Sequence, residues 1–201
     1  MIKATKSLQL SRIRGHKLYS LLSAAIIICF LYYLWWIVEY HGTVKDANTQ
    51  EPIEGAIIVA KWIQTQPLGI AGGISKWAKV KETLTDRDGR WSIRGPRGAW
   101  GRLLIVASYL ERPEFIVWKP GYCSCPDSLA IDACKKMTPV CHGEGETVEL
   151  PRLTNTQDRR RALPGRIGTP HLSRKQKTFV RLINQERRNL GMSVYKLYVE
   201  D

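Results

Sequence analysis

Four cysteines lie close together in the second half of the chain, where they can form disulfides or bind a metal ion. In the segment YCSCPDSLAIDACKKMTPVCHG they are Cys123, Cys125, Cys134 and Cys141. Their spacing lacks the paired C-x2-C knuckles of most structural zinc sites and the C-x-x-C-H signature of haem attachment. In an oxidising compartment we expect two disulfides, and a bridge between Cys123 and Cys125 would close a very tight loop. A metal site of thiolates with His142, or free redox-active thiols, are the alternatives.

A second set of possible ligands is the run DRDG, which contains Asp86, Asp88 and Gly89. An EF-hand calcium loop needs a third oxygen ligand before the glycine and a glutamate further on, and this segment has neither in register. An aspartate that bonds its own backbone, followed by a glycine that accepts a positive φ, is instead typical of a tight turn. We therefore predict a structural turn and no metal at these residues.

Patterns of catalytic sites are missing from the sequence. None of the four histidines belongs to an H-E-x-x-H helix, and there is no G-x-S-x-G nucleophile elbow. The carboxylates form no evident acid–base pair, and the glycine-rich segment 64–78 is not followed by the Gly-Lys-Ser/Thr of a phosphate loop. We expect a non-catalytic protein with no cofactor.

The segments that hold these residues have the pattern of short β-strands. β-Branched and apolar residues alternate with polar ones between turn residues, which is typical of strands. Strands are expected from residue 44 and at residues 56–62, 80–85, 90–94, 103–110, 115–119 and 144–153. The turns at 46–49 and 86–89 are predicted to close β-hairpins. Strands that follow one another without helices between them indicate an antiparallel β-sandwich.

Three of these stretches resemble a known domain family. GTVKDANTQEPIEGAIIVAKW, TLTDRDGRWSI and FIVWKPGY stand in the order found in carboxypeptidase regulatory-like domains, also called transthyretin-like or prealbumin-like domains, over residues 42–122. The later run FVRLINQERRNLG is similar to the tail of bacterial membrane-anchored envelope proteins that carry this domain. The resemblance implies a transthyretin-like β-sandwich. It implies little about activity, because this domain is an accessory module in very different proteins.

The N-terminal part contains a long apolar segment. Residues 18–38 read LYSLLSAAIIICFLYYLWWIV and include no charged side chain. As a helix they would span roughly 30 Å, the thickness of the hydrocarbon core of a bilayer. Basic residues precede the segment, so the positive-inside rule leaves residues 1–17 in the cytoplasm and exports the rest. We predict a single-pass signal anchor in a bacterial inner membrane, with Leu18 and Val38 at its ends, Trp35 and Trp36 at the interface and a periplasmic C-terminal domain; a cleaved signal peptide is the alternative.

The net charge of +13 is confined to the two ends of the chain. Residues 39–151 hold 14 Lys and Arg against 14 Asp and Glu, whereas residues 152–201 hold 12 against four. Positive flanks beside a membrane segment are more typical of topology signals and of lipid or partner contacts than of nucleic-acid binding. The expected partners are the lipid bilayer and other envelope or membrane proteins, with no nucleic acid.

The C-terminal part is predicted to hold an exposed basic linker and an amphipathic helix. Ser173 and Gln176 have the spacing of a capping box, and Gly191 is placed to end the helix. One stripe of the helix is apolar, with Leu172, Phe179, Ile183 and Leu190, and another is basic, with Arg174, Lys177, Arg181 and Arg188. Such a helix can dock on the sandwich or on the transmembrane helix, lie on anionic lipid or bind a partner subunit.

These observations divide the chain into five parts. They are a cytoplasmic basic N-terminus (1–17), a signal anchor (18–38), a β-sandwich (42–122), a cysteine-rich excursion with a last strand (123–151), and a basic linker with an amphipathic helix (152–201). We expect a membrane-proximal structural or protein-binding module. The alternatives are a metal or redox protein that uses the four cysteines, and a module for saccharide or peptidoglycan with stacking platforms among Trp62, Trp77, Trp91, Trp100 and Trp118.

Overall fold

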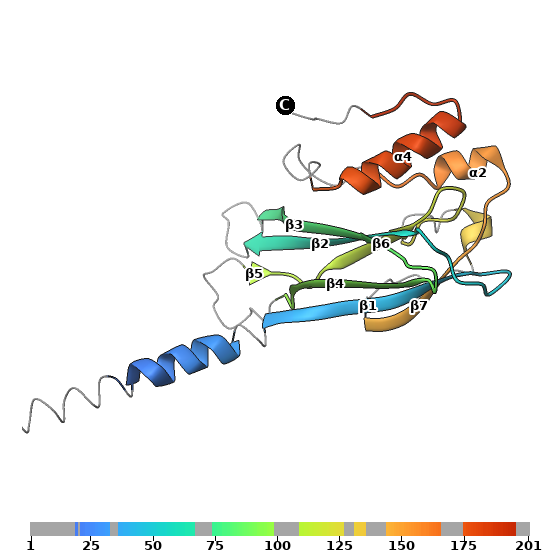
Figure 1. Cartoon of the computed structure of the whole chain (residues 1–201). Coiled ribbons are helices and arrows are strands. Elements are labelled where there is room, and N and C mark those ends of the chain that lie inside the picture. Colours follow the sequence, from blue (N-terminus) through green and yellow to red (C-terminus); the bar gives the residue numbers. More distant parts are fainter. Residues whose placement is uncertain are drawn as a thin grey trace, which may run out of the picture. The chain divides into compact units, whose positions relative to one another are not determined.

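The structure is a computed structural model of the whole chain (Figure 1). It describes residues 19, 21–32, 36–66, 74–98, 109–126, 131–135, 144–165 and 175–195. Residues Met1–Val38 form one unit, in which residues 21–32 are helical, and residues Glu39–Asp201 form a second, compact unit.

The second unit is mainly β, as the sequence predicts, with two sheets. The strands are β1 (Ile37–Asp46), β2 (Ile57–Gln66), β3 (Ile74–Leu84), β4 (Arg90–Pro96), β5 (Tyr109–Leu110), β6 (Glu114–Trp118) and β7 (Glu144–Leu150). One sheet has the order β4-β1-β7, and the other has the order β3-β2-β5 with β6 also paired to β2. A short 3-10 helix η2 (Asp132–Cys134) and the helices α2 (Thr156–Arg161) and α4 (Lys177–Asn189) complete the described elements.

Strands β2 and β6 bury both of their faces, and this explains their nearly continuous apolar sequences. On one side, Phe115 of β6 lies 5.4 Å from the rings of both Tyr40 in β1 and Trp91 in β4. These aromatic contacts form the core between the two sheets. On the other side, Trp118 of β6 meets Phe179 of α4 at 6.5 Å with its ring nearly perpendicular. Helix α4 therefore covers the outer face of the β3-β2-β6 sheet as a third layer (Figure 1).

The opening strands do not form the predicted hairpins, although the chain turns at the predicted residues. β1 and β3 begin earlier than predicted, and residues 103–108 of the predicted strand 103–110 lie outside the described residues. β1 and β2 belong to different sheets, and so do β3 and β4. The connections 47–56 and 85–89 therefore cross between sheets, and Thr85 joins them: its buried hydroxyl donates to the carbonyl of Ile53 (2.6 Å) and accepts from the N–H of Ala56 (2.8 Å). Polar turn residues show where the chain reverses, but they do not select the strand that it pairs with.

A further correction concerns strand direction. β2 pairs antiparallel with β3, β5 and β6, but β1 and β7 run parallel, with Val44 opposite Val148. Parallel neighbours need a long crossover connection, and the whole segment between Asp46 and Glu144 supplies it. The prediction of a purely antiparallel arrangement is therefore wrong for this pair.

Candidate functional site

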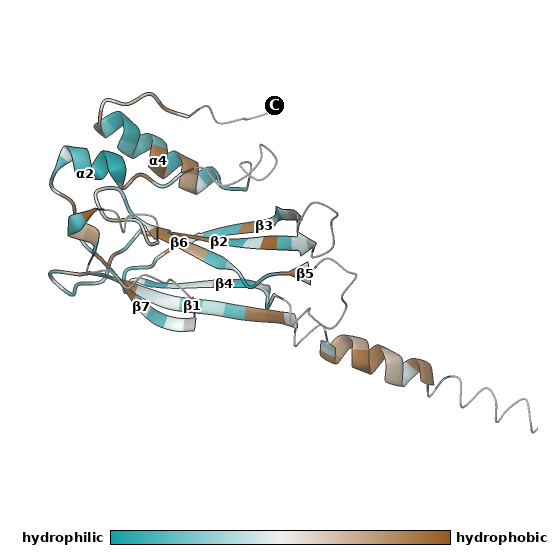
Figure 2. Cartoon of the chain, turned by 180° about the vertical axis from the view of Figure 1, so that it is seen from behind, coloured by the Kyte–Doolittle hydropathy of each residue, from teal (hydrophilic) through white to brown (hydrophobic). Residues whose placement is uncertain are grey.

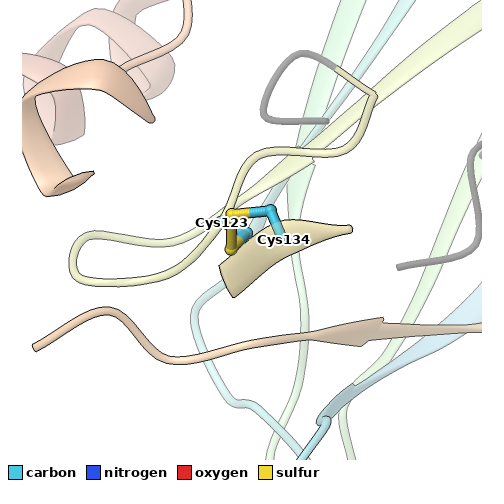
Figure 3. The surroundings of a disulfide bond; sticks show 2 residues. All are labelled: Cys123 and Cys134. Atoms are coloured by element: carbon cyan, nitrogen blue, oxygen red, sulfur yellow. A yellow bond between two sulfur atoms is a disulfide. The ribbon is translucent and has the colours of Figure 1, made fainter. Parts of the chain in front are cut away.

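The cysteine cluster forms a covalent staple at one end of the β unit. Cys123 and Cys134 are joined by a disulfide with their Cα atoms 5.9 Å apart, and both side chains are fully buried (Figure 3). The bond ties the chain that follows β6 to the short helix η2. The disulfide prediction is confirmed for this pair, and the tight Cys123–Cys125 bridge is not the one that forms.

The other cysteines are accounted for in part. Cys125 is also disulfide-bonded, whereas Cys141 and His142 lie outside the described residues. Cys29 is a free thiol on the apolar N-terminal helix. Within the described ranges no group of three or more His, Cys, Asp or Glu side chains is arranged to hold a metal ion.

Backbone hydrogen bonds fix the stapled segment to the sheets. Cys125 and Val117 exchange two N–H···O bonds of 3.0 Å, and the N–H of Cys123 donates to the carbonyl of Pro151 at 3.0 Å. Next to the staple, the hydroxyl of Tyr122 donates to the carboxylate of Asp46 at 3.2 Å. The disulfide and these hydrogen bonds hold the segment in place, which fits a structural role for the cysteines better than a reactive one.

The Asp46 carboxylate, which accepts the hydrogen bond from Tyr122, is stabilised in its charged form by its surroundings. Burial alone would raise the pKa of Asp46, but the N–H groups of Asn48 and Thr49, the hydroxyl of Tyr122 and the charge of Arg152 together hold it below its usual value. A carboxyl whose pKa is lowered by folding stabilises the fold above its unfolded-state pKa of about 3.9 and loses that contribution as the pH falls through the folded value. Burial and the Asp46 carboxylate raise the pKa of Tyr122.

The turn at Asp86, Asp88 and Gly89 has the predicted geometry. One carboxylate oxygen of Asp86 accepts from the N–H of Asp88 (3.0 Å) and from the N–H of Arg90 (2.8 Å). Gly89 has a φ of +71°, and a Cβ at this position would lie 2.4 Å from the carbonyl of Val44. The Asp86 carboxylate is thus used by its own backbone, which matches a structural turn.

The tryptophans named as possible sugar platforms are mostly buried. Trp62, Trp91 and Trp118 are only 0%, 6% and 1% exposed. Trp77 is partly buried, and the ammonium group of Lys61 lies 4.9 Å above its ring. Trp100 lies outside the described residues. Among these tryptophans, the four that the structure describes therefore offer no pair of exposed rings for a sugar.

Helix α4 begins later than the sequence predicts, and another element caps it. Its N-cap is Gln176, whose side chain makes no capping bond, and Ser173 lies outside the described residues. The N–H groups of Thr178 and Phe179 instead donate to the two carboxylate oxygens of Glu82 in β3, at 2.8 and 3.0 Å. A carboxylate at this end also complements the helix dipole. The capping box is therefore replaced by a residue almost a hundred positions away.

The other end of α4 agrees with the prediction. Gly191 has a φ of +66° and donates its N–H to the carbonyl of Arg188, while Met192 donates to the carbonyl of Arg187. This pair of bonds is the Schellman motif, which needs a left-handed residue just after the helix. The next residues turn back over the helix, because Asn184 exchanges two hydrogen bonds with the backbone of Tyr195, at 2.7 and 2.9 Å. The described residues 193–195 thus belong to no strand.

The apolar and basic stripes of α4 separate as expected, and the burial of the apolar stripe selects docking on the sandwich among the predicted alternatives for that face. Phe179 and Ile183 are fully buried against the sheet, so this face docks on the protein's own β unit. On the basic stripe, Lys177, Arg181 and Arg188 are exposed, and Arg174 lies outside the described residues.

The predicted basic linker contains a helix, α2, which forms an ion pair with α4. Helix α2 is capped by the Asn155 side chain, which accepts from the N–H of Gln157 at 2.8 Å. Arg159 of α2 binds Glu186 of α4 through two hydrogen bonds of 2.8 Å, and Glu186 is only 1% exposed. Residues 156–161 are therefore helical and not a linker, although most of their side chains are exposed, as predicted. The sequence feature that could have indicated this contact is Glu186, which is the single acidic residue in the basic helix α4.

The N-terminal helix leaves its apolar side chains exposed, whereas α4 buries them. The exposed side chains of the N-terminal helix include Leu21, Ile26, Ile28 and Phe30. Figure 2 shows the mostly hydrophobic colouring of this helix. Trp36 is helical, but Val38 belongs to strand β1, so the predicted span 18–38 extends too far; Leu18 and Trp35 lie outside the described residues. Within the described part of the chain, no helix has both the length and the apolar character needed to cross a bilayer.

Comparisons with known proteins give no relative for this chain. No family model, no curated protein and no solved structure matches it.

Proposed function

We propose that this chain is a non-catalytic, single-pass membrane protein whose exported β unit is a structural or protein-binding module close to the membrane. The observation that carries the proposal is the buried Cys123–Cys134 disulfide. Structural disulfides persist in oxidising compartments such as the periplasm, and they are rare in the cytosol.

The N-terminal helix supports the same proposal from the other end of the chain. Leu22, Ile27 and Leu31 leave at least half of their surface exposed, and no charged residue interrupts residues 18–38. Exposed apolar surface on this scale is costly in water. A bilayer would cover it, and the basic residues before the segment would keep the N-terminus in the cytoplasm of a bacterial inner membrane.

The proposed fold type is a transthyretin-like β-sandwich of the carboxypeptidase regulatory-like kind. Support comes from two sheets joined by a shared aromatic core and from three sequence stretches in the order of that family. Helix α4 and helix α2 would then be additions on one face. A module of this type acts through its surface, and the polar groups named above serve the fold itself.

A topology experiment on the full chain tests this function. Intact spheroplasts are treated with an external protease and, in parallel, with a membrane-impermeant maleimide before and after reduction, using a Cys29→Ala variant to remove the free thiol. We expect carbonate-resistant membrane association, cleavage of the β unit by the external protease, and labelling of Cys123 and Cys134 only after reduction. Release by carbonate, or protection of the β unit until the cells are lysed, would contradict the proposal.

A further inference from the structure

Three basic side chains of helix α4 lie in one exposed row. Lys177 and Arg181 are four residues apart, and Arg188 follows seven residues after Arg181. At these spacings the side chains of an α-helix point to the same side, and here they extend over about 16 Å of the helix axis. All three are exposed, whereas the apolar stripe of α4 is buried against the sheet. We call Lys177, Arg181 and Arg188 the cationic row.

The charge of the cationic row is not neutralised by the described residues around it. Within the described part of the chain, none of its three side chains forms an ion pair with an acid. The positions three and four residues away, which are its neighbours on the helix surface, contain no Asp or Glu. Glu186, the single acid of α4, is buried and bound to Arg159 of α2. The cationic row therefore presents its charge to the solvent, where an anionic partner can pair with it.

An exposed apolar side chain lies beside the cationic row. Asn184 stands between the two arginines of the row, three residues after the first and four before the second. Its side chain exchanges hydrogen bonds of 2.7 and 2.9 Å with the backbone of Tyr195, which brings Val194 next to the row. Among the described residues of the β unit, only Val194 and Leu84 are large apolar side chains that are exposed, both by 45%.

The segment that carries Val194 is held in place on both sides of it. The guanidinium of Arg187 donates to the carbonyl of Ser193 and lies 4.4 Å from the centre of the Tyr195 ring. A surface that is ordered before binding loses less conformational entropy when a partner docks. Arginine, tyrosine and methionine are also enriched in protein interfaces, and Met192 lies in the same segment.

We propose that the cationic row and Val194 bind an acidic segment of a partner protein. Carboxylates of the partner pair with the three cations, and an apolar side chain of the partner covers Val194. This inference rests on the proposed function, because export removes the β unit from cytoplasmic nucleic acid. A lipid surface fits the observations less well. A helix that lies on a membrane inserts its apolar face among the lipids, and α4 buries that face against its own sheet.

Peptide binding to the full chain in detergent tests the proposal. The probe is a fluorescent peptide of glutamates with a few leucines, about 20 residues long so that it can span the row. A matched peptide has glutamine in place of every glutamate, and fluorescence anisotropy measures both affinities. We expect the glutamate peptide to bind about tenfold tighter or more. We also expect this preference to disappear near 1 M salt, where the Debye length is about 3 Å.

Variants separate the cationic row from the positive charge of the rest of the chain. Arg181→Gln combined with Arg188→Gln should weaken binding of the glutamate peptide by about fivefold or more. The matched control, Lys76→Gln combined with Arg161→Gln, removes two exposed cations outside the row and should change the affinity by less than about twofold. Val194→Asp should weaken binding by about threefold, because it replaces the apolar contact with a like charge. These are exposed positions, so denaturant midpoints should stay unchanged in all variants.

Several results would overturn the proposal. Equal weakening in the row variant and its control would show that binding follows net charge alone, and equal affinity for the two peptides would remove the role of the carboxylates. An unchanged affinity in Val194→Asp would overturn the contact at Val194. Binding of anionic vesicles or of a DNA oligonucleotide that depends on Arg181 and Arg188, when peptide binding does not, would also overturn it. The topology experiment is independent: protection of the β unit from external protease contradicts the proposed function, and the peptide measurement still decides whether the row binds an acidic polypeptide.

Discussion

The N-terminal helix and helix α4 both contain strong apolar signals, but the structure treats them in opposite ways. In residues 21–32 the apolar side chains are exposed around the helix, whereas α4 buries Phe179, Val180 and Ile183 and leaves Lys177, Arg181 and Arg188 exposed. The period of the apolar pattern explains the difference. A single stripe at helical spacing fits one face of a sheet, while a helix that is apolar all round has no polar face to leave in water.

The comparison also shows what holds an amphipathic helix in place. α4 is attached by its apolar stripe, by Glu82 at its first turn, by Arg159 from α2 and by the left-handed glycine at its end. Each attachment can be removed separately. If the two helices differ as described, changes in α4 lower the stability of the β unit, and matched changes in the N-terminal helix do not.

The largest effect is expected from the core side chain of α4. Phe179→Ala removes a fully buried ring that packs on Trp118, and it should lower the free energy of unfolding of the β unit by about 3–5 kcal/mol. Ile27→Ala, at an exposed position of the N-terminal helix, should change it by less than about 0.5 kcal/mol. Denaturant titration of the full chain in detergent, followed by tryptophan fluorescence, measures both. Similar losses in the two variants would contradict the proposed difference between the helices.

The next largest effect concerns the ion pair between the helices. Arg159→Ala leaves the buried Glu186 carboxylate without its partner, and it should cost about 3 kcal/mol. Arg161→Ala, at an exposed position of the same helix, should be close to neutral. The double variant Arg159→Met with Glu186→Leu should recover much of the loss, because apolar side chains need no charged partner. The same denaturant titration decides, and a double variant as unstable as the single one would show that packing, rather than the unpaired charge, sets the cost.

Local features of the fold were predictable from the sequence, because short-range chemistry determines them. The Asp86 turn, the glycine stop at Gly191 and the apolar stripe of α4 depend on residues within a few positions of one another. The disulfide was expected from clustering in an exported chain, although its pairing was left open. These features follow from backbone preference and from periodicity.

The pairing of distant segments was not predictable in the same way. Nothing local in the strands 37–46 and 144–150 shows that they lie parallel, or that the turn after Asp46 leads into the other sheet. The contacts of Glu82 and Arg159 depend on where whole elements pack, so a capping box near Ser173 was the best local alternative. Long-range partners such as these are selected by the total burial that the fold achieves, which no short window of sequence contains.

A smaller effect is expected from the cap that β3 supplies to α4. Glu82→Ala leaves the N–H groups of Thr178 and Phe179 without their carboxylate, and it should cost about 1–2 kcal/mol. Glu54→Ala removes an exposed carboxylate on a connection between the sheets and should change stability by no more than about 0.5 kcal/mol. Hydrogen exchange should show faster opening of the first turn of α4 in the first variant alone. Unchanged exchange at Thr178 and Phe179 would mean that the helix start is held by packing.

The smallest effect on stability is expected from the backbone conformation of Gly191 at the end of α4. Gly191 and Gly165 both have open space where a Cβ would be added, but only Gly191 has a positive φ, of +66°. Gly191→Ala should therefore destabilise the β unit by about 1 kcal/mol, because an L-residue pays to adopt the left-handed region. Gly165→Ala should be neutral or slightly stabilising, since it restricts the unfolded chain without such strain. Thermal unfolding of the two variants under identical conditions measures the contrast. Equal unfolding midpoints for Gly191→Ala and Gly165→Ala would show that the end of α4 frays at little cost in free energy. The last turn of α4 would then lie outside the part of the β unit that unfolds cooperatively.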